Sequence, residues 1–191
     1  MSERIYPADL DPLDSGRRGH KARYYLALGL VRRGDRVLDA ACGCGYGTEM
    51  LATRARRVDG LDCDVHTIEY AKKRHLGDDQ FTIQYFQQDL DTWEPTPGVY
   101  ELVVSFETVE HLKGSPETFI EKLKSASNRT IVFSAPIVPT KQTNHHHLHD
   151  LTEQQILSAF QAGGEWVCYE AFHHRVYGVY IFVRKDKAHL L

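Results

Sequence analysis

Two groups of residues in this sequence have the types and spacing that could do chemistry. The first is an acid, Asp39, followed by glycines at Gly43, Gly45 and Gly47. Glycine reaches positive φ values and lets a ligand come close to the backbone. The residues just after the loop favour a helix, whose first N–H groups would be unpaired. This stretch therefore favours a loop that binds a nucleoside-like ligand.

Two ligand classes and a ligand-free turn all fit this loop. The dinucleotide fingerprint is G-x-G-x-x-G, whereas the third glycine here, Gly47, comes one residue early. A carboxylate at Asp39 would repel a pyrophosphate but suits a ligand with an ammonium group. Glycine-rich turns also connect strands to helices without any ligand. The loop alone leaves these three interpretations open.

The second group is Glu107, Glu110 and His111. On a helical turn, positions i, i+3 and i+4 share one face. Two carboxylates and an imidazole on one face can bind a divalent cation. Without a metal, His111 could act as a general base, and a purely structural role is the third alternative.

A third acid, Asp62, closes the short β-rich stretch 57–62, 23 positions after Asp39. In a βαβ unit that binds a nucleoside, the acid after the second strand accepts hydrogen bonds from the ribose hydroxyls. The alternative is a helix cap, but Asp64 is better placed to cap the next helix. We therefore expect Asp62 to contact a ribose.

The elements that would position these residues alternate between strands and helices. The predicted strands are 36–39, 57–62, 81–86, 99–106 and 129–135, with a final hairpin of 165–171 and 176–184; the predicted helices are 20–32, 46–54, 65–75, 117–126 and 152–162. The continuous apolar run at 99–106 is typical of a central strand that is buried on both faces. This pattern predicts an α/β fold with a doubly wound, mostly parallel sheet and ligands at the carboxyl ends of the first strands.

Composition narrows the class of protein. The chain has 191 residues, 42% hydrophobic and 26% charged, with a formal net charge of −3. We expect an N-terminal arm at 1–18 and one domain at 19–191. This net charge excludes an overall positive potential that would attract nucleic acid, but it does not exclude a local basic patch. The cysteines lack C-x-x-C spacing and the sequence shows no signal peptide, which predicts a cytoplasmic protein with free thiols. No apolar run approaches the roughly 20 residues that would span a membrane, so we expect no membrane contact.

The order and spacing of these motifs resemble those of class I S-adenosylmethionine (SAM) methyltransferases. The run Asp39-Ala-Ala-Cys-Gly-Cys-Gly resembles their first motif, and Asp62, Gln88-Asp89-Leu90 and the segment 105–112 follow in the expected order. The resemblance covers about residues 20–184. It implies a Rossmann-like sheet of the seven-strand type, in the order 3-2-1-4-5-7-6, that ends in an antiparallel hairpin. It also implies SAM as the cofactor.

The same resemblance implies roles for individual residues. Asp89 would accept a hydrogen bond from the adenine amino group, with a turn-forming aspartate as the alternative. Arg23 could pair with the SAM carboxylate. The cofactor-binding residues that it implies are Asp39, Ala41, Gly43, Gly45, Tyr46, Asp62, Cys63, Asp89, Leu90, Ser105 and Arg23.

The spacing Glu107-x-x-Glu110-His111 resembles the signature of two metal-assisted O-methyltransferase groups. One methylates catechol-like ubiquinone precursors, and the other methylates the terminal 2′-hydroxyl of small RNAs, where a later histidine completes the site. His147 is the best match to that histidine, ahead of His146 and His149. The implied catalytic residues are His111, Glu107 and His147, and the implied ligands of a divalent metal ion are Glu107, Glu110, His111 and His147. Glu-His pairs at this place are also widespread in SAM-dependent methyltransferases that need no metal.

From these observations we expect a SAM-dependent methyltransferase that acts on a hydroxyl of a small molecule or a glycan-type acceptor. One alternative is a metal-assisted 2′-O-methyltransferase that acts on nucleic acid. The other is a SAM-binding module without catalysis. The Asp/Asn-Pro-Pro-Tyr motif of amino-directed DNA enzymes is absent after 99–106, which disfavours exocyclic amines as acceptors. The sequence leaves the acceptor and the oligomeric state open.

Overall fold

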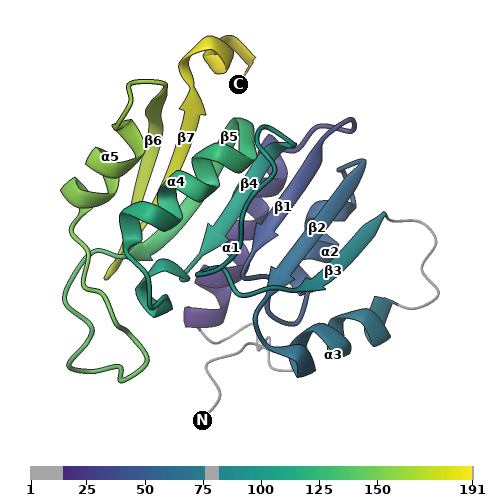
Figure 1. The fold of residues 1–191 in the computed structure, drawn as a ribbon, viewed down its shortest axis with the longest axis horizontal. Coiled ribbons are helices and arrows are strands. Elements are labelled where there is room, and N and C mark those ends of the chain that lie inside the picture. Colours follow the sequence, from purple (N-terminus) through teal and green to yellow (C-terminus); the bar gives the residue numbers. More distant parts are fainter. Residues whose placement is uncertain (1–14, 76–81, 191) are drawn as a thin grey trace. The chain divides into compact units, whose positions relative to one another are not determined.

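The computed structural model describes residues 15–75 and 82–190, and Figure 1 shows their helices and strands. They divide into two compact units, Met1–Leu90 and Asp91–Leu191. Helix α1 (Ser15–Leu30) begins about five residues earlier than predicted, so the last part of the predicted arm is helical. The rest of the arm, 1–14, lies outside the described residues. The assignment of 19–191 to one domain stays a prediction.

The first unit holds three parallel strands and the helices that connect them. Its elements after α1 are β1 (Arg36–Ala40), α2 (Tyr46–Ala52), β2 (Arg57–Asp62), α3 (Val65–His75) and β3 (Ile83–Gln87). β1 pairs with β2, and β2 pairs with β3, both in parallel register. As predicted, Asp64 caps α3, because its Oδ1 accepts the N–H groups of His66 at 2.7 Å and Thr67 at 3.1 Å. Asp62, at the end of β2, does not serve as this cap.

The second unit is built around the C-terminal hairpin. Its elements are β4 (Tyr100–Phe106), the short 3-10 helix η2 (Val109–His111), α4 (Pro116–Ala126), β5 (Ser127–Pro136), α5 (Glu153–Gln161), β6 (Trp166–His174), β7 (Tyr177–Arg184) and η3 (Lys185–Leu190). β4 and β5 are parallel, whereas β7 runs antiparallel to both β5 and β6. Ser115 caps α4 with Pro116 at its start, and Thr152 forms the predicted capping box with Gln155. Phe160 on α5 stacks on Phe182 of β7, with their ring centroids 3.8 Å apart.

The strands follow the order β3-β2-β1-β4-β5-β7-β6. This confirms the predicted fold class, the strand order and the antiparallel hairpin. The differences are at element ends. The predicted strand 81–86 begins at Ile83, and Phe81 lies outside the described residues. The residues after β4 form only a 3-10 turn, which changes the geometry of the second group of candidate residues.

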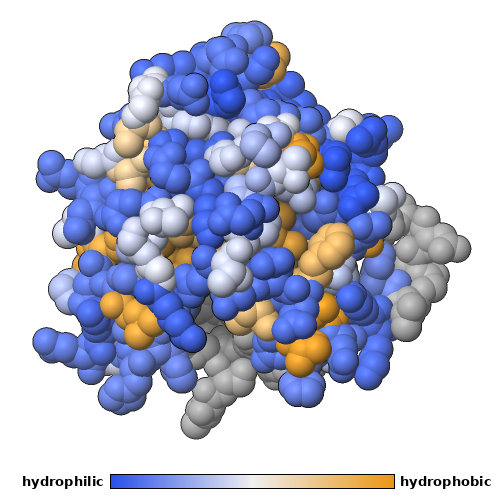
Figure 2. All heavy atoms as spheres, viewed as in Figure 1, coloured by the Kyte–Doolittle hydropathy of each residue, from blue (hydrophilic) through white to orange (hydrophobic). Residues whose placement is uncertain are grey.

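The surface of the described residues is mixed. Figure 2 shows mainly hydrophilic residues on the face that it presents, with hydrophobic residues in small, separate areas. Among the described residues, no helix combines the length and the apolar character needed to cross a membrane.

Candidate functional site

The loop between β1 and α2 uses its glycines for two different purposes. A Cβ on Gly45 would lie 2.5 Å from the hydroxyl of Tyr85, and a Cβ on Gly47 would lie 2.0 Å from the ring of Tyr24. Gly43 has a φ of 54°, and nothing lies within 4 Å of a Cβ placed on it. Gly45 and Gly47 are therefore required by packing, whereas Gly43 keeps space beside the loop into which a ligand can come.

Asp62 is held against this loop. Its Oδ2 accepts the N–H of Gly43 at 3.0 Å, and its Oδ1 accepts the N–H of Asp64 at 2.9 Å. These two bonds hold the carboxylate at the end of β2, and the residue is only 7% exposed. Each carboxylate oxygen can accept a further hydrogen bond, which suits a pair of ribose hydroxyls.

Asp39 is buried at 1% exposure near the end of β1. The hydroxyl of Thr48 donates to its Oδ2 at 2.7 Å, and the hydroxyl of Tyr24 donates to its Oδ1 at 3.1 Å. Burial raises the pKa of Asp39 to about 7, although the bonds from Thr48 and Tyr24 oppose that shift. Near neutral pH, Asp39 is therefore close to the midpoint of its ionisation.

The other predicted cofactor residues of the first unit differ in exposure. Cys63 and Asp89 are exposed, whereas Leu90 and Tyr46 are buried. Ala41, which follows β1, has a φ of 70°, an unusual conformation for a residue with a side chain. Their roles in cofactor binding stay predictions.

Arg23 and Ser105 are the remaining predicted cofactor residues, and each lies in a different unit. Arg23 on α1 is 9% exposed. Ser105 on β4 is fully buried, and among the described residues its Oγ has no hydrogen-bond partner.

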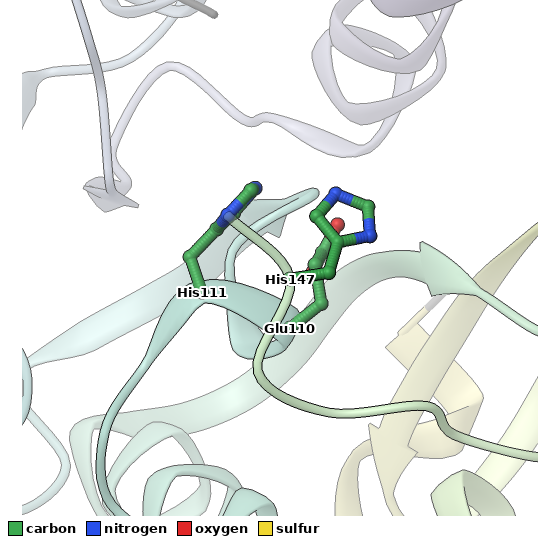
Figure 3. Close-up of side chains that lie close together, drawn as sticks. All are labelled: Glu110, His111 and His147. Carbon is green, nitrogen blue, oxygen red and sulfur yellow. The ribbon is translucent and has the colours of Figure 1, made fainter. Parts of the chain in front are cut away.

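The second group of candidate residues lies after β4. Glu110 and His111 on η2 meet His147 from the segment between β5 and α5, and one potential ligand atom of each lies within 4.8 Å of the others. Figure 3 shows that these three side chains lie close together. The centroids of the two histidine rings are 4.7 Å apart, and the ring planes make an angle of 82°. Glu110 is buried, whereas both histidines are partly exposed. The structure therefore brings three of the four predicted metal ligands together.

The structure does not bring Glu107 into this group. Glu107 has a φ of 51° and precedes the 3-10 turn, so the helical spacing assumed for it does not apply. Its Oε1 instead accepts a hydrogen bond of 2.6 Å from the hydroxyl of Ser134 on β5. A left-handed residue of this kind was not visible in the sequence, because glutamate rarely adopts that conformation.

Bonds to the following segment fix the orientation of His111. Its Nδ1 lies 3.1 Å from the backbone carbonyl oxygen of His146. A carbonyl oxygen only accepts, so Nδ1 carries the hydrogen, and a neutral His111 presents Nε2 with its lone pair. His149 makes the same kind of bond through Nε2 to the carbonyl oxygen of Leu112 at 2.9 Å. Of the three histidines considered in the sequence, only His147 therefore joins the group with its own ring.

Thr140 is a neighbour of this group that no sequence motif indicated. Its hydroxyl lies 2.6 Å from Nδ1 of His147. Its N–H, with that of Lys141, donates to Oδ1 of Asp150, and these bonds lower the pKa of the Asp150 carboxyl. Only the folded chain shows that Thr140 lies beside His147, since no motif relates the two residues.

Comparisons with known proteins indicate the family and the fold that this chain resembles. Residues 37–128 match the family described as "Methyltransferase domain". A probable S-adenosylmethionine-dependent methyltransferase of Mycolicibacterium smegmatis is 38% identical over 79 residues, which are 41% of this chain and 29% of that protein. The ubiquinone biosynthesis O-methyltransferase of Coxiella burnetii is 30% identical over 88 residues, which are 46% of this chain and 37% of that protein.

A structural comparison shows the fold. The crystal structure of magnesium protoporphyrin IX methyltransferase from Synechocystis PCC 6803 with bound SAH has a TM-score of 0.73 and 17% identity. The similarity covers 97% of this chain and 90% of that one. By sequence, in contrast, the match spans no more than 37% of the length of the two relatives named above. Residues 37–128 therefore match the methyltransferase domain family over one continuous segment that includes the glycine loop, Asp62 and β4, and the seven-stranded sheet of this chain has the fold of that structure.

Proposed function

We propose that the chain transfers the methyl group of SAM to a hydroxyl of a small molecule or a glycan-type acceptor, and that His111 activates this hydroxyl. The observation that carries the proposal is the bond from His111 Nδ1 to the carbonyl oxygen of His146 at 3.1 Å, which orients Nε2. A hydroxyl is a poor nucleophile until its proton is removed or its pKa is lowered. An imidazole held by a second bond is a suitable group for either task. The name of the Coxiella burnetii relative also supports an oxygen acceptor.

In the route without a metal, Nε2 of His111 is the general base. The acceptor oxygen attacks the methyl carbon of SAM while its proton passes to Nε2. The bond between that carbon and the sulfonium sulfur breaks, and the electron pair stays on the sulfur, so the products are a methyl ether and a neutral thioether. The carbonyl of His146 stabilises the imidazolium that forms, because Nδ1–H continues to donate to it.

The same residues fit a divalent cation. The group offers a carboxylate from Glu110 and imidazole nitrogens from His111 and His147, with one potential ligand atom of each within 4.8 Å of the others. This donor set suits a cation of intermediate hardness. Such a cation, when bound, would lower the pKa of a coordinated hydroxyl. The hydrogen bonds from His111 to His146 and between His147 and Thr140 are the kind of support that keeps ligating histidines in place.

The test is turnover of SAM with a panel of acceptors: catechols, simple sugars and an oligoribonucleotide with a free terminal 2′-hydroxyl. We expect a catechol or a sugar to be methylated, and His111→Ala to reduce turnover at least about 100-fold without changing the Kd for SAM. His145→Ala is the matched control, because His145 is an exposed histidine of the segment between β5 and α5 that also carries His147. Loss of activity with a chelator and its recovery with a divalent cation would favour the cation route over the general-base route.

Other results would reject the proposal. Methylation of the oligoribonucleotide alone would favour the nucleic-acid enzyme. SAM binding without turnover on any acceptor would favour a binding module without catalysis. Full activity of His111→Ala would exclude His111 from acceptor activation, and a preference for NAD over SAM in isothermal titration would reject the methyltransferase assignment.

A further inference from the structure

Tyr24 on α1 has contacts that an ordinary core tyrosine does not need. Its hydroxyl donates to both oxygens of the Asp39 carboxylate, at 3.1 Å to Oδ1 and 3.3 Å to Oδ2. Its ring covers Gly47 so closely that a Cβ there would lie 2.0 Å away. The same ring packs edge-on against the ring of Tyr46, with centroids 5.5 Å apart. One side chain from α1 thus contacts both the acid of β1 and the turn that starts α2.

These contacts place Tyr24 at one end of a buried polar network. His20, one turn earlier on α1, contacts the rings of Tyr24 and Tyr46, and its Nδ1 is hydrogen-bonded to the hydroxyl of Tyr46. Burial first, and then the positive charge of Arg23, lower the pKa of His20 to about 3, so this histidine is neutral at physiological pH. The network around Tyr24 therefore adds no positive charge from His20.

The charged and titratable groups that face Asp39 come from every element packed around it in the first unit. They are Tyr24 from α1, Cys42 from the glycine loop, Tyr46 from α2, Asp62 from β2 and Tyr85 from β3. Burial raises the pKa of the three tyrosines and of the cysteine above their ordinary values, so all four stay neutral near pH 7. Asp62 is the one charged neighbour in this set, and it disfavours ionisation of Asp39.

Opposing effects therefore decide whether Asp39 is charged. Burial and Asp62 favour the neutral acid, while the hydroxyls of Thr48 and Tyr24 stabilise the carboxylate. SAM carries a sulfonium and an ammonium group, so an ionised Asp39 attracts it more strongly than a neutral one does. A donor that stabilises the carboxylate then also favours binding of the cofactor.

We propose that Tyr24 is a positioning residue for SAM, whose hydroxyl keeps the Asp39 carboxylate oriented and ionised so that it attracts the positively charged part of the cofactor. This inference rests on the SAM dependence in the proposed function. It does not depend on the acceptor or on a metal. Tyr24 acts through Asp39 and is not itself a catalytic residue.

The test compares the Tyr24→Phe variant with the wild-type protein by isothermal titration with SAM between pH 5 and pH 9. Phenylalanine keeps the ring over Gly47 and removes only the hydroxyl. Tyr85→Phe is the matched control, because it removes another buried hydroxyl that touches the same loop, bonded to the carbonyl oxygen of Gly45 at 3.2 Å. The ionisation of SAM itself is the same in all three titrations, so only differences between the proteins count.

We expect the Kd of the wild-type protein to rise as the pH falls through about 7. In Tyr24→Phe the midpoint should move up by about one pH unit, since a hydrogen bond to a charged group contributes about that much to a pKa. The Kd of the variant would then be about fivefold higher at pH 7 and close to the wild-type value at pH 9. In Tyr85→Phe the midpoint should stay at the wild-type value.

A second readout separates this inference from the proposed function. The ¹³C shift of the Asp39 carboxyl, followed during a pH titration without any ligand, should show the same upward move in Tyr24→Phe. An unchanged midpoint in both measurements, or an equal move in Tyr85→Phe, would overturn the role of Tyr24. Failure of the wild-type protein to bind SAM at any pH would instead overturn the proposed function.

Discussion

The hydroxyl of Thr140 lies 2.6 Å from Nδ1 of His147 and fixes the ring that faces Glu110 and His111. Partners of this kind set the tautomer and the direction of a ligating histidine, and their loss commonly weakens metal affinity 10- to 100-fold. We expect Thr140→Val to weaken the binding of a divalent cation at least about tenfold in isothermal titration. Thr143→Val is the control, because its hydroxyl donates to the backbone carbonyl oxygen of Thr140. Equal affinities, or no cation binding by the wild-type protein, would contradict the cation route.

The two glutamates after β4 should respond differently to the loss of charge. Glu110 lies in the group with His111 and His147, whereas Glu107 accepts a hydrogen bond from Ser134. We expect Glu110→Gln to lower cation affinity and turnover at least about tenfold, since the amide is a much weaker ligand than the carboxylate. Glu107→Gln can keep the bond from Ser134 and should retain cation affinity within about twofold. The reverse order of effects would restore Glu107 to the metal site that the sequence predicted.

Asp39 should make the protein less stable as the pH rises. Its pKa is about 7 in the folded chain, above the ordinary value of 3.8, mainly because of burial. Between these two values the folded state holds a proton that the unfolded state has lost, so the free energy of unfolding falls with increasing pH, by about 1.4 kcal/mol per pH unit at most. We expect Asp39→Asn to remove this term. In urea unfolding, the free energy of unfolding of the variant minus that of the wild-type protein should increase from pH 4 to pH 7.

The same substitution should weaken SAM binding, because it removes the negative charge. At pH 8 we therefore expect Asp39→Asn to be more stable than the wild-type protein and to bind SAM with a higher Kd. A variant that is no more stable than the wild-type protein at pH 8 would show that the carboxylate is better solvated than its 1% exposure indicates.

Alanine at two glycines of the loop should separate packing from ligand access. A Cβ at position 47 would lie 2.0 Å from Tyr24, so Gly47→Ala should lower the free energy of unfolding by about 3 kcal/mol. A Cβ at position 43 meets nothing within 4 Å but strains a residue with a φ of 54°, so Gly43→Ala should lower stability by about 1–2 kcal/mol. Urea unfolding measures both values. Titration with SAM should show that Gly43→Ala loses more affinity than Gly47→Ala, relative to the stability that each variant loses.

The fold was largely predictable because the sequence patterns depend on local physics. The apolar run that became β4, the glycine loop after β1 and the caps at Ser115 and Thr152 each act over a few residues. The alternation of strands and helices with a final hairpin then leaves few topologies. The start of α1 was misplaced because residues 15–19 have no apolar periodicity to mark it.

The site was predictable in part. His147 could be selected from its histidine-rich neighbourhood by motif order, and the structure places it beside Glu110 and His111. Glu107 was assigned to the same group because helical spacing was assumed where the backbone is left-handed. Tyr24 and Thr140 could not be found, since each acts through a contact with a residue distant in the chain: Asp39 is 15 positions from Tyr24, and His147 is 7 from Thr140.

The contact between Tyr24 and Gly47 links two positions that lie on different helices. While the tyrosine ring is present, only glycine fits at position 47, because any Cβ would overlap the ring. A smaller residue at position 24 would remove that restriction, so the harm done by Gly47→Ala should depend on what occupies position 24. The two positions should therefore change together in evolution. Libraries that vary one of them alone would discard combinations that fold when both vary.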